Sequence, residues 1–432
     1  MVKIQSIQAL EVLDARGVPA IAVEVWLDDG SFGLANVPSG SSTGQYEMAE
    51  LRDGDSKRYG GKGVLTAVHN INKIIAPSLV GQDALSQDNI DQLLIELDGS
   101  SNKSNLGANA MLGVSAAVAW AAAKSSGKQL YEYLSQEKTF SIPVPMIDII
   151  NGSAHADNSL DIQGIMLVPH TKRPYHESIR MCAEIGYSLG ELLGDDGYQI
   201  TVGDEGGYAP RLETLELAFE FVMRAVERSG FELGSDVSFA LDVAASEIIE
   251  YREEGILYHF ARSSGRYYST AELIALYEEW LGKYPIMSIE DGLGENDWEG
   301  WQELTSRLGD KVLLIGDDLF VTNTSRIAQG IETKVANGVL IKPNQVGTLT
   351  EAREAMELAK QANYYNIVSH RSGETCDSTI ADFAVAHGAN FLKAGALCRG
   401  ERIAKYNRLL FIEKQLGDRV SYMSWPGANL RG

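Results

Sequence analysis

Short apolar runs alternate with amphipathic stretches along the second part of the chain. Helical periodicity occupies the spaces between the runs, as in STAELIALYEEWLGKY and TLTEAREAMELAKQAN. Five runs lie at 237–246, 285–293, 312–320, 338–346 and 366–374, and a weaker sixth covers 390–400. After the first, longer step the repeat is about 25 residues, which is typical of parallel strands joined by right-handed crossovers. Six or more such units predict an α/β fold and favour a (β/α) barrel over an open sheet, although the pattern alone leaves barrel closure undecided.

The first part of the chain follows a different pattern, typical of an α+β domain. VKIQSIQALEVL alternates like a strand, and AIAVEVWL and FGLANV flank DDGS like the strands of a hairpin. Helical periodicity follows at 64–80, 89–99 and 108–127, and the last of these is apolar nearly all round, as in a buried core helix. The polar stretch 135–145 carries two prolines near its end. The sequence therefore predicts an N-terminal α+β domain at 1–137 and a second domain at 138–432.

The composition narrows the classes of partner. The 432 residues include 37 Lys and Arg against 59 Asp and Glu, a net charge of −22, which argues against nucleic acid and anionic membranes as general partners. The three cysteines lie far apart, so a disulfide framework is not expected. The N-terminus lacks the apolar stretch of a signal peptide, and no run reaches the length of a membrane helix. We expect a cytoplasmic protein.

Ionisable side chains stand at the end of each apolar run. They are Asp242, Glu290, Asp317, Lys342, the pair His370 and Arg371, and Lys393. The carboxyl ends of parallel barrel strands open onto one face, and that face is where barrel enzymes carry out their chemistry. A single charge at a strand end needs no function, because the following loop is solvated. Acids on three consecutive runs and bases on the next three predict a site.

The acidic and the basic side chains are expected to have different roles in this predicted site. The three carboxylates would repel one another without a counter-ion, and ligand sets made only of oxygen suit a hard divalent cation, Mg²⁺ before Mn²⁺. Arg371, Lys393 and Lys342 form a cationic cluster for an anionic substrate. A lysine beside a metal ion and other cations has a lowered pKa, so Lys342 is a candidate base for a proton next to a carboxylate. The segment ITVGDEGGYAP adds a candidate acid, Asp204 or Glu205, next to two glycines.

Taken together, these segments resemble the enolase (phosphopyruvate hydratase) family over residues 3–415. The motifs are GDEGGYAP, SIEDGL, GDDLFVTN, LIKPNQVGTLTE, SHRSGET and RIAKYN, with PSGSSTG, ELRDGD and NKSNLGANA in the first part. The resemblance implies an eight-stranded enolase-type (β/α)8 barrel whose first units are partly antiparallel, capped by the smaller N-terminal domain. It also implies two Mg²⁺ ions, a cytoplasmic location, a role in glycolysis and gluconeogenesis, and a homodimer or a higher oligomer of dimers.

The resemblance also implies a role for individual residues. Lys342 matches the base that removes the C2 proton of 2-phosphoglycerate, and Glu205 matches the acid that expels the C3 hydroxyl. The matches to metal ligands are Asp242, Glu290 and Asp317 for the tighter Mg²⁺, and Ser42 for the second. The matches to substrate-binding positions are His155, Glu290, Asp317, Ser369, His370, Arg371, Ser372 and Lys393, with the phosphate held mainly by Arg371 and Ser372.

Two departures from the family pattern affect the expected reaction. The family usually has an acidic residue after Gln163, where it helps to place the leaving hydroxyl, but this chain has Gly164. The usual Thr-Gly after the last strand-end lysine is replaced by Ala394-Gly395. The first change should weaken expulsion of the hydroxyl or make room for a different group.

Three functions follow from these observations. The first is dehydration of 2-phosphoglycerate to phosphoenolpyruvate. The second is an enolase-like reaction on a related phosphorylated or phosphonate acid, in the manner of carboxyphosphonoenolpyruvate synthase, which Gly164 and Ala394 favour. The third is a catalytically weak enolase-like protein kept for binding or scaffolding. The third is disfavoured, because a chain freed from catalysis has no physical reason to hold three mutually repelling carboxylates.

Overall fold

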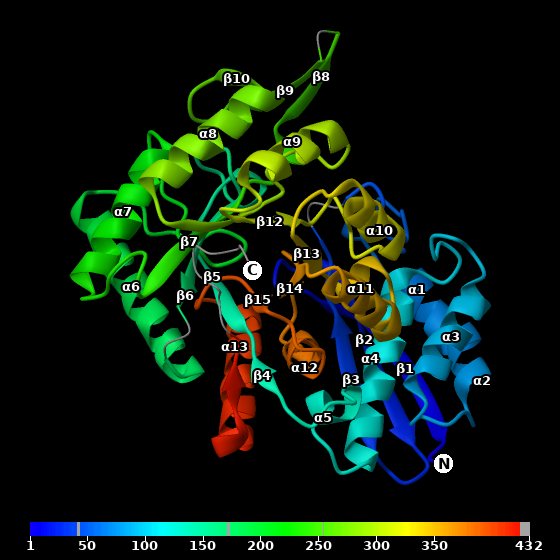
Figure 1. Cartoon of the computed structure of the whole chain (residues 1–432). Coiled ribbons are helices and arrows are strands. Elements are labelled where there is room, and N and C mark those ends of the chain that lie inside the picture. Colours follow the sequence, from blue (N-terminus) through cyan, green and yellow to red (C-terminus); the bar gives the residue numbers. More distant parts are fainter. Residues whose placement is uncertain (41–43, 171–172, 254, 424–432) are drawn as a thin grey trace.

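The chain folds into a closed barrel with a smaller α+β unit packed against it (Figure 1). The structure is a computed structural model that describes residues 1–40, 44–170, 173–253 and 255–423. The smaller unit is built from the first part of the chain, and the barrel from the remainder. The predicted combination of an α/β barrel and a smaller N-terminal α+β unit is confirmed.

A three-stranded antiparallel sheet forms the base of the smaller unit. Its strands are β1 (Ile4–Leu13), β2 (Pro19–Leu27) and β3 (Phe32–Val37), in that order, and β2 and β3 form the predicted hairpin. Helix α4 (Ala108–Ser125) packs on β2 and β3 so closely that a Cβ on Gly33 would lie 2.0 Å from the carbonyl oxygen of Ala117. Only glycine permits this approach. Helix α4 is buried along most of its length, as predicted.

The remaining helices of this unit surround α4. They are α1 (Leu65–Asn70), α2 (Ala76–Leu79), α3 (Gln87–Asp98) and α5 (Leu130–Leu134), with a π-helical turn at Ile71–Ile75 between α1 and α2. The pattern at 64–80 thus predicted helical structure correctly but not its division at that turn. In the part of the chain that the structure describes, no helix is both long enough and apolar enough to cross a membrane.

Eight strands close the barrel in the order β11-β12-β13-β14-β15-β5-β6-β7. Their bounds are β5 (Val144–Asn151), β6 (Gly164–Pro169), β7 (Val237–Asp242), β11 (Ile286–Glu290), β12 (Leu313–Gly316), β13 (Gly338–Ile341), β14 (Tyr365–Ser369) and β15 (Phe391–Lys393). Strand β6 runs antiparallel to both of its neighbours, and all other neighbouring pairs are parallel. Because of this reversal, β6 begins, rather than ends, at the rim where β5 and β7 end.

Helices and one small sheet cover the outside of the barrel. The helices are α6 (Tyr175–Asp195), α7 (Leu215–Arg228), α8 (Thr270–Lys283), α9 (Trp298–Leu308), α10 (Thr324–Thr333), α11 (Leu349–Gln361), α12 (Thr379–Ala386) and α13 (Gly400–Leu416). The longer first step of the repeat is explained by an antiparallel sheet inserted after β7, formed by β8 (Ile249–Arg252), β9 (Gly255–Phe260) and β10 (Arg266–Ser269). Strands β4 (Ser141–Ile142) and β16 (Ser421–Tyr422) form a short parallel pair. This pair joins the segment before β5 to the segment after α13.

Apolar side chains fill the inside of the barrel. The cluster consists of Val144, Met146, Met166, Val168, Ala240, Met287, Leu313, Ile315, Leu340, Ile367 and Phe391. Layers of such side chains make a barrel of this size a packed core rather than a pore. Polar groups that face inward beyond this core are therefore confined to the rim at the strand ends.

Candidate active site

The strand-end charges predicted from the sequence converge at one rim of the barrel. Strands β7, β11 and β15 end at Asp242, Glu290 and Lys393, and the ammonium Nζ of Lys393 lies 2.7 Å from Asp242 Oδ2 and 2.8 Å from Glu290 Oε1. Asp317 and Lys342 follow β12 and β13, with Lys342 Nζ 2.5 Å from Asp317 Oδ2. Residues spread over 150 positions thus form two adjoining groups of ion pairs.

The acidic side of this rim is suited to a cation. Asp242 and Glu290 are paired across β7 and β11, and both are buried. Burial and the charge of Asp242 raise the pKa of Glu290 to about 8, although Lys393 acts in the opposite direction. Oxygen-only donors that repel one another in a dry site are the donor set that a hard divalent cation relieves. The residues present therefore fit Mg²⁺.

A second group of acids borders the first. Asp291, Asp317 and Asp318 each place a carboxylate oxygen within 4.8 Å of the others, so these acidic groups could hold a metal ion. Asp291 also accepts hydrogen bonds from the backbone N–H groups of Asp317, at 2.8 Å, and Asp318, at 2.9 Å. It thereby fixes the turn after β12 that carries Asp317.

The pKa of Lys342 departs from the expectation that neighbouring cations lower it. Burial lowers the pKa of this ammonium and Arg371 acts in the same direction, but the carboxylates of Asp317 and Glu290 together outweigh them, and the pKa is raised. The sequence could not show that Lys342 and Asp317, on neighbouring strands, would form so close a pair. In the protein alone, Lys342 is therefore held in its charged form.

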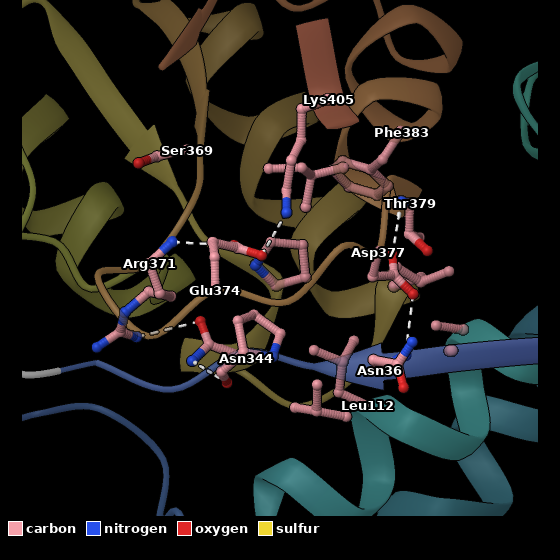
Figure 2. A pocket seen from close by; sticks show the side chains of 17 residues that line it. Asn36, Leu112, Asn344, Ser369, Arg371, Glu374, Asp377, Thr379, Phe383 and Lys405 are labelled. Carbon is pink, nitrogen blue, oxygen red and sulfur yellow. Dashed lines mark hydrogen bonds and ion pairs between the residues drawn. The ribbon is translucent and has the colours of Figure 1, made fainter. Parts of the chain in front are cut away.

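Arg371, the predicted anion-binding residue, lies beside a carboxylate from the smaller unit. Its guanidinium donates to Glu47 through Nη1, at 3.0 Å, and Nη2, at 3.1 Å. Nη1 also donates to Asn344 Oδ1 at 3.1 Å (Figure 2). The amide of Gln345 donates to the same glutamate at 3.3 Å. Glu47 thus contacts the guanidinium in the bidentate way that a carboxylate or phosphate ligand would use.

A network of buried hydrogen bonds holds the loop after β14, which carries Arg371, in place (Figure 2). Glu374 accepts hydrogen bonds from the backbone N–H of Arg371, at 3.1 Å, and from Lys405 Nζ, at 2.6 Å. Asp377 accepts from the backbone N–H of Asn36 on β3 at 2.9 Å. These contacts line a small cavity between the two units and fix the loop against both of them.

The candidate acid Glu205 lies in a tightly bound loop. The backbone N–H of Gly207 donates to the side-chain oxygen of Asn151 at the end of β5. The backbone N–H of Ala396, which follows β15, donates to the carbonyl oxygen of Glu205. Gly206 has φ +90°, and a Cβ there would lie 3.0 Å from the carbonyl oxygen of Cys398. A glycine is therefore required next to the acid.

Two histidines face the Glu205 carboxylate. His155 Nδ1 lies 3.5 Å from Glu205 Oε2, and His370 Nε2 lies 3.4 Å from Oε1. Buried Arg402 donates to His370 Nδ1 at 2.7 Å, so the neutral ring carries its proton on Nε2, toward Glu205. Burial and the charge of Arg402 lower the pKa of His370 to about 4, against the opposing effect of Glu205.

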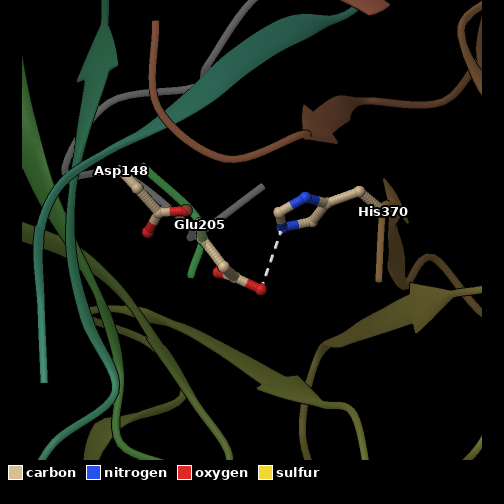
Figure 3. Close-up of side chains that lie close together, drawn as sticks. All are labelled: Asp148, Glu205 and His370. Atoms are coloured by element: carbon tan, nitrogen blue, oxygen red, sulfur yellow. Dashed lines mark ion pairs between the residues drawn. The ribbon is translucent and has the colours of Figure 1, made fainter. Parts of the chain in front are cut away.

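Asp148 on β5 brings a second carboxyl group to Glu205 (Figure 3). Asp148, Glu205 and His370 each place one polar atom within 4.8 Å of the others, and all three are buried. Burial and the Glu205 carboxylate raise the pKa of Asp148. Burial would raise the pKa of Glu205 as well, but His155, His370 and Lys393 outweigh it and lower the pKa. In the protein alone, a proton held by the two carboxyl groups therefore resides on Asp148.

The other predicted site residues lie near these groups, with one exception. Ser369 ends β14 and donates to the His370 carbonyl at 3.0 Å, and the carbonyl of buried Ser372 accepts from Arg402 at 2.5 Å. Gly164 begins β6 at the rim. Ser42 lies outside the described residues. The roles of all these residues stay predictions.

Sequence reasoning did not identify Asp148, Glu47 or Arg402. Asp148 interrupts the apolar stretch VPMIDIIN, as Lys342 ends VLIK, and this signal could have marked it. Glu47 lies in a loop of the smaller unit and Arg402 in an ordinary helical pattern, so nothing local distinguishes either one. Their positions depend on how distant segments pack.

Two protein-family models match the chain. The one described as the enolase N-terminal domain matches residues 4–134, and the one described as the enolase C-terminal TIM barrel domain matches residues 139–429. The matches are consistent with the motifs that suggested the resemblance. The domain boundary after residue 137 stays a prediction.

Proposed function

The chain belongs to the enolase family, and from this premise we propose that it dehydrates 2-phosphoglycerate to phosphoenolpyruvate. Membership indicates a lyase-type enzyme acting on a small phosphorylated acid. The observation that carries the specific proposal is the convergence of Lys342, Asp317 and Lys393 with the paired carboxylates at one rim. The predicted homodimer and cytoplasmic location stay predictions.

In the proposed reaction, Lys342 Nζ takes the C2 proton and the electron pair of the C2–H bond forms the new C2–C3 double bond. The C3–O bond breaks, and the hydroxyl leaves as water with a proton from the Glu205 side of the site. Arg371 and Ser372 hold the phosphate. Asp242, Glu290 and Asp317 would hold Mg²⁺, which when bound would supply positive charge for the substrate carboxylate and reduce the hold of Asp317 on Lys342.

A second candidate function is supported by Gly164. Position 164 carries no acidic side chain, so the leaving-group side departs from the family pattern, which favours an enolase-like reaction on a related phosphorylated or phosphonate acid. The first steps of both reactions are the same, because Lys342 and the acidic cluster serve each of them. The two functions differ only on the leaving-group side.

The test is a coupled assay that measures phosphoenolpyruvate formed from 2-phosphoglycerate and Mg²⁺, run beside exchange of the C2 proton in deuterated water. We expect both product and exchange. Exchange without product would favour the second function, because the base and the metal site would be working while the hydroxyl stayed in place. Neither product nor exchange would contradict both.

A further inference from the structure

The space above Gly164 is taken by a side chain from the neighbouring strand. Gly164 and Asp148 lie on β6 and β5, which pair as antiparallel strands. A Cβ built on Gly164 would lie 3.0 Å from Asp148 Oδ1 and 3.8 Å from the Cβ of Asp242. The Asp148 carboxyl group therefore occupies the position into which a side chain at 164 would point.

The Asp148 carboxyl group is also incompletely bonded. The residue is 3% exposed, and its Oδ2 has no hydrogen-bond partner among the residues that the structure describes. A buried polar atom without a partner destabilises the folded protein, so folding alone gives no reason for a carboxyl group here. Asparagine would fill the same volume at less cost.

The neighbours of Asp148 point to a task in the site. Asp148, Glu205 and His370 each place a polar atom within 4.8 Å of the others, and Figure 3 shows the Asp148 and Glu205 carboxyl groups side by side. Among the described residues, His155 Nδ1 and His370 Nε2 also lack hydrogen-bond partners. Three incompletely bonded groups thus surround Glu205, where the leaving hydroxyl must be received.

We propose that Asp148 is a positioning residue for dehydration, which supplies from β5 a second carboxyl group beside Glu205 in the space that Gly164 leaves open. Asp148 and Glu205 hold one proton between them. When the C3–O bond breaks, that proton passes through Glu205 to the hydroxyl, which leaves as water, and both carboxyl groups are then ionised. The raised pKa of Asp148 agrees with this arrangement. The proposal rests on the dehydration proposed above.

The test compares two rates in the same variants. In Asp148→Asn, which keeps the shape of the side chain, we expect phosphoenolpyruvate formation to fall about 100-fold, the size of an acid–base contribution. Exchange of the C2 proton should stay near the wild-type rate, because Lys342 is untouched. Asp195→Asn, at the exposed end of α6, is the control and should leave both rates unchanged.

A strand-swap variant separates a chemical role from a packing role. Asp148→Ala should lose product formation, and Asp148→Ala/Gly164→Asp should regain about tenfold or more of it, because β6 then carries the carboxyl group to nearly the same place. Gly164 does not have a positive φ, so its backbone accepts a side chain. Three results would overturn the proposal. The first is product formation at the wild-type rate in Asp148→Asn, and the second is an equal loss of both rates in that variant. The third is no recovery of product formation in Asp148→Ala/Gly164→Asp. Failure of the proposed function can be told apart from failure of the Asp148 proposal, because the wild-type protein itself would then form no phosphoenolpyruvate.

Discussion

The two sides of the barrel rim are built on different electrostatic principles. On the lysine side, the ammonium groups of Lys342 and Lys393 lie 2.5–2.9 Å from carboxylate oxygens of Asp317, Asp242 and Glu290. On the Glu205 side, the closest histidine contacts are 3.4 and 3.5 Å. On the lysine side, each ammonium group is paired with a carboxylate and the surplus negative charge favours a cation, whereas the Glu205 side holds polar atoms without hydrogen-bond partners among the described residues.

The difference indicates which side each reaction step needs. Pairing an ammonium group with a carboxylate lowers the cost of burying both, and the carboxylates in excess favour a bound cation. Groups without partners are costly unless a ligand bonds to them. In the proposed reaction, the lysine side would serve proton removal and the Glu205 side would receive the polar leaving group.

The largest effect should come from removing the base. Lys342→Ala should lower both C2 proton exchange and product formation by about 10⁴-fold, since both require proton removal. The two rates are measured by deuterium incorporation and by the coupled assay. Lys283→Ala, which removes an exposed lysine paired with Glu279, should change neither. Exchange that survived in Lys342→Ala would assign the base to another group.

A smaller and one-sided loss should follow from Glu205→Gln. We expect product formation to fall about 100- to 1,000-fold while C2 exchange continues, because only the leaving-group side has changed. The ratio of the two rates in one variant is the measurement, so differences in protein concentration cancel. If exchange fell as far as product formation, the two sides would not act as separate units.

Magnesium should stabilise the folded protein through the lysine side alone. At a concentration 100-fold above its dissociation constant, a ligand adds about 2.7 kcal/mol to the free energy of unfolding. We expect Mg²⁺ to raise the thermal unfolding temperature of the wild-type protein and of Asp148→Asn, and chelation to reverse it. Asp242→Asn should lose most of this shift. An unchanged shift in Asp242→Asn would remove Asp242 from the metal site.

The sequence predicted one side of the rim better than the other, for a physical reason. Asp242, Glu290 and Lys393 end strands that the repeat of apolar runs predicts, and parallel strands bring such ends together. The Glu205 side has no such rule. Asp148 lies inside β5, Gly164 starts the antiparallel strand β6, and Glu205 lies in a loop.

The pKa of Lys342 is raised rather than lowered for a reason that the strand pattern does not contain. Strand order can be predicted from the repeat, but the distance from an ammonium to one carboxylate depends on side-chain placement. Asp317, at 2.5 Å, is the carboxylate that raises the pKa of Lys342 most, and together with Glu290 it outweighs burial. The fold class, by contrast, depends on periodicity and turn positions, which the sequence displays directly, as in the hairpin of β2 and β3.

The smallest predicted effect tests whether His370 on the Glu205 side is neutral. Its pKa is lowered to about 4, mainly by burial, against an ordinary value of 6.5. As the pH falls below 6.5, the unfolded chain takes up a proton at this histidine before the folded protein does, so the stability contributed by neutral His370 is lost as the pH falls toward 4.

The measurement is the free energy of unfolding of the wild-type protein relative to His370→Asn, by denaturant titration. Between pH 7 and pH 5.5 this difference should fall by about 1 kcal/mol. The asparagine oxygen can still accept from Arg402, so packing is kept. His69→Asn, on the exposed face of α1, should follow the wild-type curve. A difference that rose as the pH fell would mean that His370 is charged and forms an ion pair with Glu205. The Glu205 side would then contain an ion pair, as the lysine side does.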